Sequence, residues 1–350
     1  MELTTQDNHY RAPWIDALRI IATVLVVVVH ASTYFFELHA PAYSSWPWLT
    51  AAAYGSIARV CVPLFFMITG YLLFRGDIEP VSFWNRRISR LAIPWLFWSG
   101  IYLVHRRWNL GNDISIYSAV RLMLVNDVYY HLWFLYSLFW IYVAIPFFTP
   151  IINFKSQLLA SVAAVLWCTN TVILPSISEW LTEGTGFNCH FAVETPVFSG
   201  YLGFVLLGFI IGRMQTTRIR TTLFVSMLLL GMILTMLLTV QASVSAGSGD
   251  QRWFGYFCPS VVMAACGVFY LGRYLSGMSD RSTIRRLAAL TFGVYLVHPL
   301  MLEATLPIVK AKLSNSLLGV PLLTAMVLLL SFGVVFLLAK VPGVRRIVLC

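Results

Sequence analysis

The sequence predicts an all-α, polytopic integral membrane protein with about ten transmembrane helices and both termini in the cytoplasm. Apolar residues make up 59% of the chain and charged residues only 11%, whereas about 25% of the residues of a soluble domain are charged. The mean hydropathy is +0.78, and the apolar residues gather in segments long enough to cross a bilayer. Because no segment is typical of a soluble domain, residues 1–350 are expected to form a single transmembrane domain.

The predicted spans follow one another along the chain, and each has close to the ~20 residues that cross the hydrocarbon core. They are residues 14–36, 50–74, 89–105, 128–149, 157–175, 197–214, 221–241, 255–275, 286–306 and 318–340. Pro94 and Pro299 interrupt the third and ninth of these segments. The first segment is longer than the apolar core of a cleavable signal peptide, so we expect it to remain as a span.

Lysine and arginine are distributed unevenly among the predicted loops. Sixteen lie on the side of the termini and six on the other side, with Arg19 and Arg59 inside spans. Cytoplasmic loops carry the excess of basic residues, which places both termini in the cytoplasm and explains the net charge of +10 without nucleic acid as a partner. The cysteines lack metal-ligand spacing, so no metal is expected, and a Cys189–Cys258 disulfide is left open.

The first span carries ionisable residues, which are costly inside a bilayer. Arg19 and His30 are eleven residues apart, a spacing that places both on one helix face and separates them by roughly 16 Å along the axis. Asp16 precedes Arg19 by three residues, the spacing of an ion pair that would hold the guanidinium. A lone buried histidine usually belongs to a polar packing stripe, but the alignment with Arg19 favours a functional site.

The second span contains Arg59 too deep for its guanidinium to reach either surface easily. Pro63 cannot donate to the carbonyl of residue 59, so the helix is expected to kink there. Thr69 and Tyr71 flank Gly70 and offer hydroxyl groups. A functional site and a helix-packing motif explain this segment equally well.

Three arginines, Arg86, Arg87 and Arg90, lie at the cytoplasmic start of the third span. Arg87 and Arg90 are three residues apart and share a helix face. The ordinary interpretation is a basic cytoplasmic loop. Guanidinium groups also bind phosphate in a bidentate way, which would suit a cytoplasmic nucleotide-like ligand.

Two further histidines lie at membrane depth. His131 is near the outer end of the fourth span with Trp133 beside it, and His298 is on one stripe of the ninth span with Tyr295. Pro299 should leave the carbonyl of Tyr295 without its helical partner. Singly, each histidine is best explained by packing, but three histidines and two arginines inside apolar spans exceed what packing requires.

Together these segments resemble the membrane-bound acyltransferase-3 family of bacterial O-acyltransferases, and the resemblance covers the whole chain. Thr69 stands where serine is commoner in that family. Among the members of that family, the enterobacterial common antigen O-acetyltransferase type has the most similar motifs. The segments that carry the resemblance are WIDALRIIATVLVVVVH, RVCVPLFFMITGYLL, RISR, HLWFL and GVYLVH.

The resemblance implies a multi-pass protein of the bacterial inner membrane, surrounded by membrane lipid, that uses cytoplasmic acetyl-CoA as its acyl donor. The implied acceptor is a hydroxyl of a cell-surface or lipid-linked glycan. The catalytic candidates are His30, Arg19 and Asp16; the donor-binding candidates are Arg59, Arg86, Arg87 and Arg90, with Arg59 in the same cytoplasm-facing cavity; further cavity candidates are Thr69, Tyr71, His131, Trp133, Tyr295 and His298.

The chemistry agrees with this implication, because a sugar hydroxyl is a poor nucleophile and a positioned imidazole accelerates its attack typically 10²–10⁴-fold. Whether His30 acts as a general base or carries the acyl group covalently is left open by its spacing. The alternative function is a transporter or flippase for a lipid-linked sugar or a small acylated metabolite, because ionisable residues also line transport paths. Many transporters contain internal repeats, and none is evident in this sequence.

Overall fold

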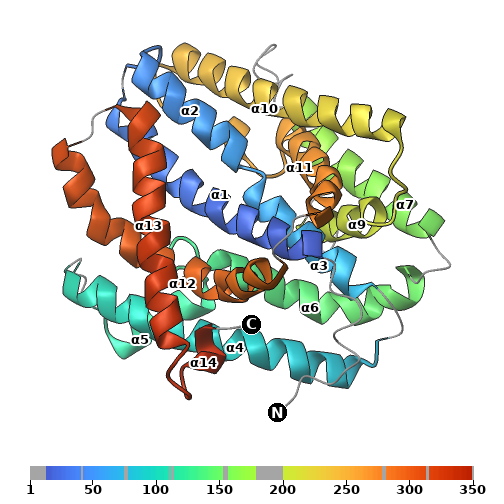
Figure 1. Cartoon of the computed structure of the whole chain (residues 1–350), viewed down its shortest axis with the longest axis horizontal. Coiled ribbons are helices and arrows are strands. Elements are labelled where there is room, and N and C mark those ends of the chain that lie inside the picture. The colour runs from blue at the N-terminus through green and yellow to red at the C-terminus, as the bar shows by residue number, and fades with distance from the viewer. Residues whose placement is uncertain are drawn as a thin grey trace.

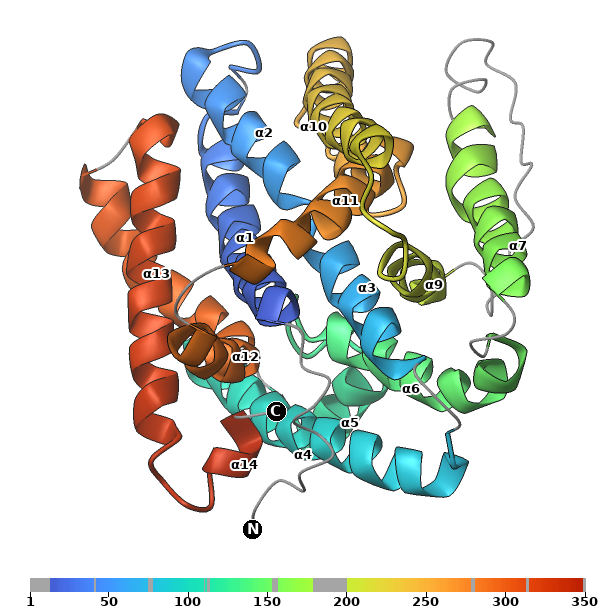
Figure 2. The same ribbon diagram turned by 45° about the vertical axis from the view of Figure 1, so that its right-hand side comes forward.

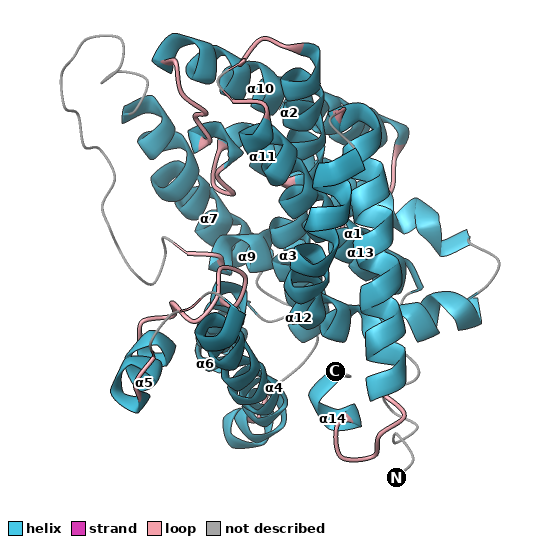
Figure 3. Cartoon of the chain, turned by 90° about the vertical axis from the view of Figure 1, so that its left-hand side faces the viewer, coloured by secondary structure: helices cyan, strands magenta, loops and turns pink. Residues whose placement is uncertain are grey.

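The computed structural model describes residues 13–40, 42–74, 78–109, 111, 114–152, 157–178, 200–277, 281–312 and 315–348. All regular elements within these ranges are helices (Figure 3). The predicted class, an all-α polytopic membrane protein, is confirmed, because 7 helices are long and apolar enough to cross a membrane. The number of about ten spans and the cytoplasmic location of the termini stay predictions.

Figure 1 shows the helices in the order of the chain, from blue at the N-terminus to red at the C-terminus. The first half contains α1 (Pro13–Leu38), α2 (Trp46–Ala58), α3 (Cys61–Leu73), α4 (Pro80–Asn109), α5 (Ile116–Leu124), α6 (Trp133–Ile152), α7 (Gln157–Trp167) and the π-helix η1 (Cys168–Ile173). The second half contains α9 (Leu202–Ile211), α10 (Arg218–Ala246), η2 (Arg252–Phe254), α11 (Pro259–Leu271), η3 (Gly272–Gly277), α12 (Arg281–Lys312), α13 (Ser316–Leu338) and α14 (Arg345–Val348).

The second predicted span is divided into two helices at the place that its proline indicates. The helix α2 ends before Arg59, and α3 begins after Val60. Pro63 lacks the N–H that would bond to the carbonyl of Arg59, and the new helix starts with the amide of Leu64 donating to the carbonyl of Val60 at 3.0 Å. The expected kink is therefore confirmed as a full break.

Three predicted spans are not among the 7 candidate spans of the described residues. The span predicted at 128–149 corresponds to α6, which begins only at Trp133 and whose apolar part, Trp133–Thr149, is shorter than a candidate span. Residues 89–105 are the middle of the longer helix α4, which continues through Pro94 and has arginines near both ends; it is not among the helices that meet the criteria for a span. Of the predicted span 197–214, only Leu202–Ile211 is helical, and residues 197–199 lie outside the described ranges. Arg213 follows the end of this helix, and its guanidinium donates to the carbonyl of Phe74 and lies over the Phe209 ring.

Helix α1 occupies the centre of the bundle. It contacts α2, α3, α12 and α13 (Figures 1 and 2), and its residues Leu18 and Ala22 are fully buried. Polar side chains on such a helix face protein rather than lipid. The position of α1 therefore gives Asp16, Arg19 and His30 access to the interior.

Helices α3 and α9 pack backbone against backbone. A Cβ on Gly70 would overlap the carbonyl oxygen of Val205, and a Cβ on Gly208 would overlap the backbone of Met67. Small residues permit such an approach, and close packing is a main source of helix association in membranes. This contact fixes α3, which carries the wall of the interior cavities described below.

The replacement Gly70→Ala is expected to destabilise the protein by about 3 kcal/mol, the upper end of the range for overpacking, because the clash is with backbone. Thermal unfolding of the purified protein in detergent measures the effect. Gly100→Ala is the matched control in α4, since no atom lies within 4 Å of its added Cβ. Equal stability of the two variants would contradict the close contact between α3 and α9.

Candidate active site

The ion pair expected on the first helix is present. An oxygen of Asp16 lies 3.6 Å from a guanidinium nitrogen of Arg19, and the carboxylate is buried while the guanidinium is partly exposed. The hydroxyl of Thr23 donates to the carbonyl of Arg19 at 2.8 Å. Asp16 therefore restrains Arg19 from the protein side and leaves its outer surface directed toward open space.

Arg19 lines a cavity of about 230 Å³. Arg87 and Arg90 of α4 line the same cavity, and Arg90 is exposed, so the cavity reaches the protein surface. Thr69 also lines it, although its hydroxyl donates to the carbonyl of Phe65 at 2.9 Å. The structure thus brings together three arginines that the sequence places in two separate helices.

A smaller cavity of about 40 Å³, called the histidine chamber here, is lined by His30 and His131. Its apolar walls include Val26 and Val29 of α1 and Val62 of α3. Cys61, Trp133 and Tyr256 complete its polar and aromatic parts. The chamber lies deep in the bundle, because none of its three valines is more than 7% exposed.

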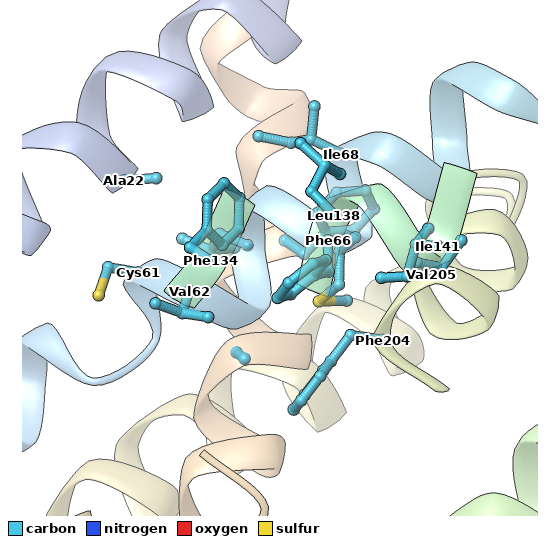
Figure 4. Packing of buried hydrophobic residues seen from close by; sticks show 14 of the residues in the cluster. Ala22, Cys61, Val62, Phe66, Ile68, Phe134, Leu138, Ile141, Phe204 and Val205 are labelled. Carbon is cyan, nitrogen blue, oxygen red and sulfur yellow. The ribbon is translucent and has the colours of Figure 1, made fainter. Parts of the chain in front are cut away.

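Phe134 and Tyr295 line both the large cavity and the histidine chamber. Their ring centroids are 5.5 Å apart in an edge-to-face arrangement, and the hydroxyl of Tyr295 donates to the carbonyl of His131. Figure 4 shows Phe134 over Val62 and beside Phe66, at the centre of the core. The two cavities are therefore neighbours, and these two rings lie between them.

Three histidines from distant parts of the chain form a cluster. The ring centroid of His298 lies 5.3 Å from that of His30 and 5.5 Å from that of His131. Within the described ranges, these residues do not form a group that could hold a metal ion. His298 is stacked on His30 and lies edge-on to His131. His30 and His131 line the chamber, whereas His298, also expected to line a cavity, lines neither cavity.

His298 is held in one orientation by its own helix. Its Nδ1 lies 2.6 Å from the carbonyl oxygen of Tyr295, the oxygen that Pro299 leaves without a helical partner. Nδ1 therefore donates, and Nε2, which is buried and has no partner among the described residues, carries the lone pair of the neutral ring. The prediction of a free carbonyl at Tyr295 is confirmed, and α12 continues through the proline.

Arg59 lies apart from the cavity in which the sequence places it. It lines neither the large cavity nor the histidine chamber, and its guanidinium lies over the ring of Phe254, 4.5 Å from the centroid. The reason is the helix break, since Arg59 belongs to the end of α2 and not to the face of α3 that carries Thr69. Arg59 nevertheless interacts with Tyr256 and His30, which line the chamber.

Two other expected cavity residues also lie elsewhere. Arg86 is exposed and does not line the cavity of Arg87, because neighbouring helix positions diverge by about 100°. Tyr71 packs on Trp14 with 4.8 Å between ring centroids, because it is about 200° around the helix from Thr69. Cys189, left open as a partner of Cys258, lies outside the described residues.

Several residues of this region were not predicted from the sequence. Val26 precedes His30 by four residues, and the helical repeat would have placed it on the same face. Phe134 is part of the HLWFL segment, but its role as a shared wall depends on tertiary packing. Tyr130, whose ring lies 4.9 Å from that of His30, is 47% exposed and carries no signal in the sequence beyond its aromatic neighbours.

A family model described as an acyltransferase domain, Acyl_transf_3, matches residues 12–340. The chain belongs to the acyltransferase-3 family. The match includes every residue that lines the two cavities of this acyltransferase. The resemblance inferred from the motifs is thereby confirmed for the family, and the multi-pass membrane location agrees with the 7 candidate spans.

Two curated proteins are similar to parts of this acyltransferase. A serine/alanine racemase of Enterococcus gallinarum is 30% identical over 127 residues, which are 34% of this chain and 17% of the racemase. An amino-acid racemase of Enterococcus faecalis is 33% identical over 132 residues, which are 36% of this chain and 18% of that protein. The chain thus spans less than a fifth of each relative's length. No solved structure matches it.

Proposed function

We propose that this acyltransferase moves an acetyl group from cytoplasmic acetyl-CoA to a hydroxyl of a cell-surface or lipid-linked glycan, with His30 as the catalytic histidine. One observation carries the proposal: a surface-reaching cavity with Arg19, Arg87 and Arg90 adjoins a buried chamber with His30. The first is suited to phosphates, and the second is suited to proton transfer away from water.

The donor would bind with its phosphates at the large cavity. Arginine holds phosphate oxygens in a bidentate way, and Arg87 and Arg90 are the arginines of α4 that line this cavity. Arg19 and His30 are separated by roughly 16 Å along α1, a distance that the slender pantetheine arm can cover. The arm would pass between Phe134 and Tyr295, the residues shared by the two cavities.

In the chamber, the acceptor hydroxyl would attack the thioester carbonyl carbon while a nitrogen of neutral His30 takes the hydroxyl proton. The new C–O bond forms as the C–S bond breaks, and the imidazolium returns the proton to the departing thiolate. An acyl-imidazole on His30 is the other chemical route. It would be detected as acetyl-labelled protein before any acceptor is added.

The acceptor would approach from the end of the molecule opposite the arginines. Tyr130 contacts His30 with 4.9 Å between ring centroids and is 47% exposed, so this ring connects the imidazole with the protein surface. Aromatic rings offer apolar faces beside a hydroxyl group, which suits a sugar. The excess of Lys and Arg in the predicted loops on the other side supports a location of this end outside the cytoplasm, which a bacterial inner-membrane protein that modifies surface glycans would require.

Reconstitution tests the proposal. The purified protein in liposomes would receive radiolabelled acetyl-CoA with or without lipid-linked saccharides extracted from bacterial membranes. We expect release of free coenzyme A only with the saccharides, together with a base-labile acetyl label on them. Movement of unmodified saccharide across the liposome without consumption of acetyl-CoA would instead support a flippase. If the protein is an O-acetyltransferase of the enterobacterial common antigen type, we expect the acetyl label on the lipid-linked saccharide of that antigen.

A further inference from the structure

The histidine chamber is small relative to common acyl groups. Its volume is about 40 Å³, whereas the large cavity measures about 230 Å³. An acetyl group has three non-hydrogen atoms and is the shortest of the common acyl groups. A butyryl group has two more carbons, and a succinyl group adds a carboxylate as well.

Three valines form an apolar part of the wall of the histidine chamber. Val26 and Val29 belong to α1 and are each 5% exposed, and Val62 belongs to α3 and is 7% exposed. β-Branched side chains in helices have one strongly preferred rotamer, so this wall cannot retreat by turning a side chain. It is also apolar, and a carboxylate pressed against it would lose its hydration without a partner.

We propose that Val26, Val29 and Val62 set an upper limit on the acyl group, so that the chamber admits acetyl and excludes longer or charged acyl groups. The inference rests on the proposed function, because it requires the thioester carbonyl to lie beside His30. It also requires the carbonyl substituent to face the valines, so that each further methylene brings the acyl chain closer to their side chains.

Competition between acyl-CoA donors tests this limit. The purified protein would be assayed with acetyl-CoA, propionyl-CoA, butyryl-CoA and succinyl-CoA, and kcat/KM determined for each. Since one methylene changes discrimination by about 10–200-fold in an apolar pocket, we expect the wild type to prefer acetyl over butyryl by at least about 100-fold. Val29→Ala is expected to reduce that ratio at least about tenfold, chiefly by raising the rate with butyryl-CoA.

Val27→Ala is the matched control. Val27 is on the same helix and 1% exposed, but it packs with Phe35 and Trp48 in the other core cluster and does not line the chamber. The Val27→Ala variant is expected to be destabilised about as much as Val29→Ala. It should keep the wild-type ratio of kcat/KM for acetyl-CoA to kcat/KM for butyryl-CoA. Because both donors are measured on one preparation, the ratio does not depend on the fraction of protein that is folded. Val62→Ala supplies a second variant from another helix.

The outcomes separate the two proposals. Equal use of acetyl-CoA and butyryl-CoA by the wild type would overturn the size limit while leaving acyl transfer intact. A ratio that changes as much in Val27→Ala as in Val29→Ala and Val62→Ala would overturn the role of the valines. If no acyl-CoA is consumed with an acceptor present, the proposed function fails, and the limit fails with it.

Discussion

The replacement His30→Ala is expected to lower the rate of acetyl transfer by about 10²–10⁴-fold, the usual contribution of a general base. The chamber would keep its walls, because His30 lines it only in part and the neighbouring valines and rings remain. The KM for acetyl-CoA should change little, since the arginines of the large cavity are untouched. Acceptor-dependent release of coenzyme A measures the effect.

His39→Ala is the matched control for this experiment. His39 follows the end of α1, where its ring stacks on Phe35, and it lines neither cavity. Its replacement should leave the transfer rate within about twofold of the wild type, as for sites remote from the chemistry. Full activity of His30→Ala in a protein that accumulates and melts normally would remove the proposed mechanism.

The double replacement Arg87→Ala with Arg90→Ala is expected to raise the KM for acetyl-CoA by at least about 100-fold. Hydrogen bonds to charged groups contribute about 1.5–3 kcal/mol each, and about 1.4 kcal/mol corresponds to tenfold in binding. The kcat at saturation should fall much less, because neither arginine lines the histidine chamber. Steady-state kinetics at several donor concentrations separate the two constants.

Arg86→Ala is the control for charge. It removes the same charge from the same turn of α4, but Arg86 does not line the cavity. We expect its KM to stay close to that of the wild type. If Arg86→Ala raises the KM for acetyl-CoA as much as the double replacement does, the effect is a general attraction by the basic surface and not binding at a donor site.

Features that depend on the geometry of a single helix could be predicted from the sequence. The ion pair of Asp16 with Arg19 follows from the helical repeat, as does the access of Arg19 and His30 to interior space. The break at Arg59 and the bond from His298 to its own helix follow from the missing N–H of proline. These results need no knowledge of the neighbouring helices.

Features that depend on how helices meet could not be predicted. Phe134 and Tyr295 line both cavities although they are far apart in the chain, and no local pattern brings them together. The position of Arg59 over Phe254 depends on the direction that α2 and α3 take after their break. Helix α4 is longer than the predicted span, because the arginines near its ends are typical of loops although the helix extends through them.

The two rings between the cavities also bear on the permeability of the membrane. A bacterial inner membrane stores energy as a proton gradient, and a continuous watery path wide enough for pantetheine would dissipate it. With Phe134 and Tyr295 in contact at 5.5 Å, apolar rings interrupt such a path, and a bound donor arm would itself occlude the gap that it opens. Under the proposed function, the nucleotide would stay in the cytosol while only a two-carbon fragment crosses, so that the cell would lose neither coenzyme nor protons.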